Sequence, residues 1–103
     1  MRALKIGAIG SIELVEITGS TVEEQNDCIW EILGGYFDII RIPWGAVMLV
    51  DDEGLLKGLP DNPVAARIAG YPIITGTALI TGIEDTPDGE VFTDCPEHYA
   101  DYA

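Results

Sequence analysis

The sequence predicts a single α+β domain, in which a small antiparallel or mixed sheet packs with one main helix and one short helix. Three observations support this prediction. Short β-prone stretches with alternating or wholly apolar patterns recur along the chain. Two segments begin with helix-capping residues and end in glycine. The chain has 103 residues, of which 48% are hydrophobic, and this suits one globular domain.

The expected strands follow from alternation, β-branched residues and glycine turns. Gly7 and Gly10 indicate a turn that joins the first two stretches into a hairpin. The wholly apolar run over residues 46–50 indicates a strand that is buried on both faces. The expected strands span residues 2–8, 11–17, 36–43, 46–51 and 73–80, and residues 55–60 are a candidate for a further short strand.

Two helices are expected from their caps. Ser20-Thr21-Val22-Glu23 has the form of a capping box, and a double glycine closes the run that follows. The main helix should therefore span residues 21–33 and place Trp30 in the core. Asn62, followed by proline, is typical of a helix start, because its side chain accepts a hydrogen bond from the first turn. A short helix should follow over residues 64–69.

Negative charge dominates the composition. The chain has 18 Asp and Glu residues against five Lys and Arg, which is a formal net charge of −13. Because nucleic acids and anionic membranes are bound through Lys and Arg, direct binding to either is not expected as the main activity. Residues 84–103 contain seven of the acids and no Lys or Arg. We therefore divide the chain into one α+β domain, residues 1–83, and an acidic C-terminal extension, residues 84–103, docked on that domain.

Few residues could support catalysis or metal binding. His98 is the only histidine, and Cys28 and Cys95 are too few for a disulfide framework. Carboxylates around Cys95 would raise the pKa of its thiol and weaken it as a nucleophile. One His and two Cys fall short of the four ligands of a zinc site. We therefore expect no enzymatic activity, no cofactor and no bound metal.

A small anion site is the main candidate for ligand binding. Lys57, Asn62 and Arg67 bring two of the five basic residues and a helix N-terminus within eleven positions, an arrangement that suits a phosphate group. Thr75 and Thr77 would add contacts. The ligand would be a small phosphate-bearing, nucleotide-like molecule, shared between the subunits of a homo-oligomer. The alternative is a structural turn in which Lys57 and Arg67 offset neighbouring acids.

The location expected from the sequence is the cytoplasm. The N-terminal residues lack the apolar run of a signal peptide, and no apolar run approaches the ~20 residues that span a membrane. Two cysteines without a framework suit a reducing compartment.

Three sequence blocks carry a resemblance to a known family. They are Ile32-Leu33-Gly34-Gly35-Tyr36, then Asp52-Glu53-Gly54-Leu55-Leu56-Lys57-Gly58-Leu59-Pro60-Asp61-Asn62, then Thr75-Gly76-Thr77-Ala78-Leu79-Ile80-Thr81-Gly82. In order and spacing they resemble the domain-of-unknown-function 3846 family, small proteins of phages and conjugative elements, over nearly the whole chain. The resemblance implies a short α+β domain from a mobile element, in the host cytoplasm if it is phage-encoded. It implies no mechanism.

The leading expectation is a non-enzymatic phage or mobile-element accessory protein that binds a host protein. In one version it serves counter-defence as an acidic decoy, whose carboxylates imitate DNA phosphates and occupy a basic groove of the partner. An exposed Trp44 would be a good contact anchor, whereas the plainer reading is that it caps the core. The expected partner-binding residues are Trp44, Glu84, Asp85, Asp88, Glu90, Asp94, Glu97 and Asp101.

Two further functions stay open from the sequence. One is the oligomeric small-ligand binder, and the other is an accessory or structural protein without a host target. A generally acidic proteome would also produce this net charge without any mimicry.

Overall fold

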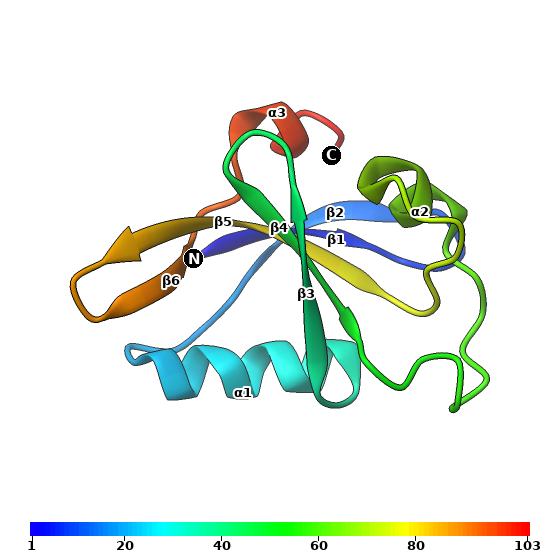
Figure 1. Cartoon of the computed structure of the whole chain (residues 1–103), viewed down its shortest axis with the longest axis horizontal. Helices are drawn as coiled ribbons and strands as arrows, with labels where there is room; N and C mark the ends of the chain where they lie inside the picture. Colours follow the sequence, from blue (N-terminus) through cyan, green and yellow to red (C-terminus); the bar gives the residue numbers. More distant parts are fainter.

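The computed structural model describes residues 1–103 and contains a six-stranded antiparallel sheet with helices on both faces (Figure 1). The predicted α+β class is therefore confirmed. The strands are β1 (Arg2–Ile6), β2 (Ile12–Glu16), β3 (Phe37–Ile42), β4 (Ala46–Asp51), β5 (Ala78–Thr86) and β6 (Gly89–Thr93). The helices are α1 (Val22–Leu33), α2 (Pro63–Ala69) and α3 (Glu97–Ala100).

The sheet is built around the long strand β5. The strand order is β2-β1-β5-β4-β3, and β6 pairs with β5 beyond the end of β1. Gly82 marks this division, because it faces Ala46 of β4 on one side and Thr93 of β6 on the other. β2 and β3 are the edge strands of the main path, and each pairs with one neighbour.

Two apolar layers hold the helices against opposite faces of the sheet (Figure 1). One layer packs α1 against the sheet through Ile29 and Leu33. The other packs α2 and α3 through Ala65 and Tyr99. β4 contributes to both layers, and all six of its residues are buried, as the apolar run over residues 46–50 predicted.

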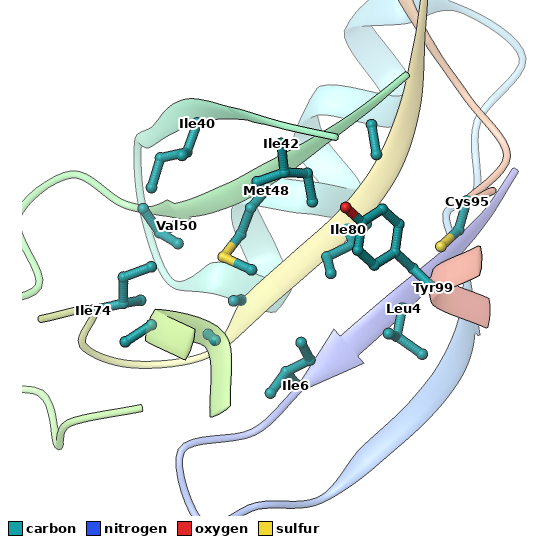
Figure 2. Close-up of a cluster of buried hydrophobic side chains, with 14 residues drawn as sticks. Leu4, Ile6, Ile40, Ile42, Met48, Val50, Ile74, Ile80, Cys95 and Tyr99 are labelled. Carbon is teal, nitrogen blue, oxygen red and sulfur yellow. The ribbon is translucent and has the colours of Figure 1, made fainter. Parts of the chain in front are cut away.

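Figure 2 shows the side chains of the layer beneath α2 and α3. Ile40, Val50 and Ile74 lie together at one end of this layer, and Tyr99 and Cys95 lie at the other. Each end borders a surface cavity, so the two cavities lie over the same apolar layer.

The main helix begins one residue later than the capping box suggested. Thr21, and not Ser20, is its N-cap, and the Thr21 hydroxyl accepts a hydrogen bond of 3.1 Å from the amide of Glu24. Gly34 ends the helix in the left-handed region at φ 90°, where a side chain would be strained.

Trp30 does not lie in the core, contrary to the prediction. Its side chain is 41% exposed and packs edge-on against Tyr36, with ring centroids 4.3 Å apart. The reason is the helical period: Ile29 and Leu33 occupy the buried stripe, and the residue after Ile29 is rotated by about 100° away from it.

Residues 84–103 are integral to the sheet and core rather than an appended extension. β5 crosses the proposed boundary without interruption, and β6 returns along it. The chain then bonds to β1, where the amide of Arg2 donates to Asp94 Oδ1 at 2.8 Å and the amide of Cys95 donates to the Arg2 carbonyl at 2.8 Å. Tyr99 of α3 is 3% exposed and belongs to the core.

Two expected strand segments have other structures. In place of a strand over residues 55–60, residues 55–58 form turns and residues 59–60 have no regular structure. Local bonds hold the turns, such as that from the Lys57 amide to the Glu53 carbonyl at 2.9 Å. The strand expected over residues 73–80 begins only at Ala78, since Gly76 takes a left-handed conformation at φ 76°.

Candidate functional site

Lys57 is engaged within the protein and is not free to meet an anion. Its Nζ lies 2.7 Å from Asp51 Oδ2 and donates to the Gly34 carbonyl at 3.1 Å. Burial alone would raise the pKa of Asp51, but the hydrogen bonds from Lys57 and the Glu53 amide, with the charge of Lys57, outweigh it and lower that pKa. The hydrogen bond to Asp51 raises the pKa of Lys57. Both groups are therefore charged at neutral pH and neutralise each other.

Asn62 is a buried structural residue. Its Oδ1 accepts from the Ala65 amide at 3.1 Å, which caps α2 as predicted. Its Nδ2 donates to the carbonyls of Ile6 at 3.0 Å and Gly76 at 2.9 Å. The side chain thus joins α2 to β1 and to the segment before β5, and no polar atom of it points to a ligand.

The five predicted ligand-binding residues do not converge on one site. Thr75 is buried and lies against Gly54, where an added Cβ would collide with its hydroxyl, and Thr77 is half-buried. Arg67 is exposed on α2 and lines a different cavity from Thr75. Together with the contacts of Lys57 and Asn62, these placements favour the alternative that residues 57–67 have a structural role over the hypothesis of a shared phosphate site.

The acids of residues 84–103 are all exposed, but two of them have internal partners. Glu90 Oε1 lies 2.6 Å from Arg41 Nη2, and this hydrogen bond lowers the pKa of Glu90 and raises the pKa of Arg41. Asp94 accepts from the amide of Arg2. The others are spread over β5, the β5–β6 turn, α3 and the residue that follows α3, and they are Glu84, Asp85, Asp88, Glu97 and Asp101.

An open groove borders the edge strand β3 and was missed at the sequence level. It is a cavity of about 580 Å³ whose floor consists of Ile40, Val50 and Ile74, seen at one end of the layer in Figure 2. Its apolar walls are exposed, and Leu55 and Leu56 keep 73% and 86% of their surface in solvent. The full lining is Asp38, Ile39, Ile40, Val50, Asp51, Asp52, Glu53, Gly54, Leu55, Leu56, Tyr71, Ile73, Ile74 and Thr75.

The rim of this groove is acidic. Asp38, Asp52 and Glu53 are exposed there, and none of the three forms a salt bridge. The groove can therefore hold apolar side chains on its walls and cationic groups at its mouth. The sequence did carry a signal, because two adjacent leucines in an acidic, glycine-rich turn have no local structural purpose. That signal was interpreted as a short strand.

A second cavity of about 390 Å³ lies where the β3–β4 turn meets α2 and α3. Its lining includes Trp44, Arg67, His98, Tyr99 and Tyr102. Trp44 is 66% exposed, which settles the question left open by the sequence, and it stacks on His98 with ring centroids 4.6 Å apart. Arg67 makes no salt bridge.

Trp44 has an unusual backbone conformation. It is the one non-glycine residue with positive φ, at 71°, in the turn between β3 and β4. A bulky residue in the left-handed region of backbone conformation is strained by about 1–3 kcal/mol, and residues with such strain are concentrated at functional sites. The turn is held from below by the Tyr99 hydroxyl, which donates to the Pro43 carbonyl at 2.9 Å.

Cys95 and His98 face different surroundings. Cys95 is buried, and burial raises the pKa of its thiol, which keeps it protonated and weakly nucleophilic. His98 is exposed and stacks against Trp44.

No group of three or more His, Cys, Asp or Glu side chains is arranged to hold a metal ion. None of the three helices has the length and apolar character needed to cross a membrane.

Comparisons with known proteins bear on the family. No curated protein and no solved structure matches the chain. A family model described as a domain of unknown function, DUF3846, matches residues 1–103. This match confirms the resemblance carried by the three sequence blocks, and the chain belongs to the DUF3846 family.

Proposed function

We propose that the protein is a non-enzymatic binding protein that recognises a basic, apolar segment of another protein in the groove beside β3. The observation that carries this proposal is the combination of exposed leucines and free carboxylates around one cavity of about 580 Å³. Cavities of about 300–1,000 Å³ are typical of binding sites. In a phage or mobile element the partner would be a host protein, and counter-defence would follow from occupying its basic surface.

The exposed leucines support a binding role. Burying one leucine side chain is favourable by about 1.5–3 kcal/mol, and contiguous apolar surface on a monomer is typical of an interaction site. Leu55 and Leu56 lie in a turn segment, where polar residues would serve the fold equally well. Tyr71 and Ile73, each at least half exposed, extend the same apolar surface.

The charge of the rim supports a basic partner. Asp38, Asp52 and Glu53 would lie close to any segment seated in the groove. A second copy of this chain would bring another net charge of −13 to the same surface, so like-charge repulsion opposes self-association there. A basic partner is attracted instead, and the long-range field of the acidic chain would speed its association.

The acidic-decoy form of this hypothesis uses a different surface. A decoy would bind through many carboxylates of residues 84–103, and its affinity would fall steeply with salt. Groove binding adds apolar burial, which salt does not screen, so a substantial part of its affinity would persist at high salt. The salt dependence of binding therefore separates the two forms.

If the partner binds in the groove, its affinity should depend strongly on Leu55 and Leu56. The probe is a fluorescein-labelled peptide of alternating lysine and leucine, and an alternating glutamate and leucine peptide is the charge control. Changing both Leu55→Ser and Leu56→Ser should weaken binding of the lysine peptide at least tenfold. The burial of one leucine side chain is worth at least about 1.5 kcal/mol, and a loss of about 1.4 kcal/mol in binding free energy is a tenfold rise in Kd. Fluorescence anisotropy at low and at high salt measures the affinities.

Ile9→Ser is the matched control. Ile9 is 95% exposed and lies in the β1–β2 turn, outside the groove, so this variant should bind like the wild type. Undiminished binding by the double leucine variant would argue against the groove. If that binding also vanished at high salt, the decoy form would be favoured.

The second cavity favours a second candidate, a small planar ligand with an anionic group. Trp44 offers an exposed ring for stacking, and Arg67 offers an unpaired guanidinium in the same cavity. Guanidinium groups match phosphate geometry well. Of the residues first assigned to a nucleotide-like ligand, only Arg67 lies in this cavity, and it is joined there by Trp44.

Thermal unfolding with a panel of nucleoside monophosphates tests this second candidate. A ligand at 100 times its Kd stabilises a protein by about 2.7 kcal/mol, which is readily seen as a rise in Tm. Trp44→Gly should abolish the rise, and Trp30→Ala, a change on the opposite face, should preserve it. No rise with any nucleotide, or an equal rise in the Trp44→Gly variant, would eliminate this candidate.

A further inference from the structure

The outer edge of β3 carries unpaired backbone groups. In an antiparallel pair, successive residues of a strand direct their N–H and C=O groups alternately toward and away from the partner. The amide of Asp52 donates to the Tyr36 carbonyl at 3.1 Å, so Tyr36 faces β4. It follows that Phe37, Ile39 and Arg41 direct their backbone groups away from β4.

The β4–β5 ladder leads independently to the same assignment. The amide of Ile83 in β5 donates to the Gly45 carbonyl at 3.1 Å, so odd-numbered residues of β4 bond toward β5. Even-numbered residues of β4 then bond toward β3, where their partners are Asp38, Ile40 and Ile42. The remaining three residues of β3 have no strand to pair with, since β3 is the last strand of the sheet.

β3 has few of the features that usually block edge pairing. Exposed edges are commonly protected by proline, by charged side chains, above all lysine, or by a bulge. β3 has six residues in unbroken register with β4, with no proline and no lysine. Its one basic residue, Arg41, is paired with Glu90 at 2.6 Å and so would not repel a basic partner.

This open edge borders the groove. Asp38, Ile39 and Ile40 of β3 all line the groove. A strand added beside β3 would place every second side chain on the face that carries Ile40, above the apolar walls. Asp38 shares this face, so its carboxylate lies beside the added row, while lysines of the other row are attracted by the field of the acidic chain and not by a direct contact with Asp38. The edge would supply backbone hydrogen bonds, and the groove would select side chains.

We propose that the partner segment docks as an extra strand on the edge of β3, with apolar residues at alternate positions and lysine or arginine among the others. This inference rests on the proposed groove function and specifies how the partner is held. The occupant is an extended segment, and a helix lying in the groove would leave the β3 edge unpaired.

Amide hydrogen exchange with the alternating lysine and leucine peptide tests the docking mode. The amides of Phe37, Ile39 and Arg41 should exchange at least tenfold more slowly when the peptide is bound. The amides of Asp38, Ile40 and Ile42 serve as internal controls, because they already bond to β4. Unchanged exchange at Phe37, Ile39 and Arg41 while the peptide is bound would contradict strand addition.

Backbone methylation of the peptide supplies a second measurement that needs no protein variant. N-methylation of the alternate positions that face β3 should weaken binding at least tenfold, whereas methylation of the other set should change it less than twofold. Ile39→Pro should also reduce affinity relative to Ile39→Ala, because proline removes an outward N–H that is not part of the β3–β4 ladder.

The outcomes separate this inference from the proposed function. If the peptide binds, depends on the groove leucines and tolerates both methylation patterns, strand addition is wrong and groove binding stands. If the peptide does not bind at all, both are overturned.

Discussion

Replacing Tyr99 with alanine is expected to destabilise the protein by about 3–5 kcal/mol, as for other large aromatic side chains removed from a core. Tyr99 is 3% exposed, and its ring fills one end of the apolar layer in Figure 2. Its hydroxyl also holds the β3–β4 turn through the Pro43 carbonyl. The free energy of unfolding from urea denaturation measures the loss.

Two companion variants separate the ring from the hydroxyl and from its surroundings. Tyr99→Phe removes only the hydrogen bond and should lose about 0.5–1.5 kcal/mol. Tyr102→Ala changes a neighbouring ring that is 49% exposed, and it should have a smaller effect than the loss of Tyr99. A loss below about 1 kcal/mol for Tyr99→Ala would mean that residues 84–103 are only loosely attached.

Replacing Asn62 is the second change with a large expected effect. Asn62→Ala removes the cap of α2 and leaves the carbonyls of Ile6 and Gly76 without the donor that they share. Caps contribute about 0.5–2 kcal/mol, and each buried group left unsatisfied costs about 1–3 kcal/mol. A destabilisation of about 2–4 kcal/mol is therefore expected, measured as above.

Asn62→Asp is the sharper form of this test. The aspartate retains the capping acceptor, but it loses both donors and places a buried carboxylate beside two carbonyl oxygens. It should therefore destabilise the protein at least as much as Asn62→Ala at neutral pH. Burial raises the pKa of such a carboxyl. The loss in the free energy of unfolding, relative to the wild type, should therefore shrink as the pH falls and the group becomes protonated. Near-wild-type stability at neutral pH would show that capping alone explains Asn62.

Local patterns predicted most of the elements correctly. The apolar run of β4 indicated a strand buried on both faces, and Asn62 was identified as the cap of α2. Such features depend on residues within one turn or one strand, so the sequence contains all of the necessary information. Trp30 was misplaced because a position beside the buried stripe of a helix is ambiguous by one residue.

The candidate sites could not be read from the sequence in the same way. Lys57 was predicted to bind an anion. The chain turns back after β4, and this turn places Lys57 beside Asp51, the last residue of that strand. Residues 84–103 were predicted to be an appendage because their composition shows only the acids. The hydrogen bond that ties them to β1 joins Arg2 to Asp94, 92 positions apart along the chain.

By itself the sequence determined the α+β class, the cap of α2, the acidic character and the family, because these depend on local pattern and composition. Only the tertiary structure decided where a partner can bind. The groove combines β3, the turn after β4 and the segment after α2. Its leucines are exposed and its edge is open only because no other strand of the sheet reaches them, and that is a property of how the strands pack rather than of any one segment.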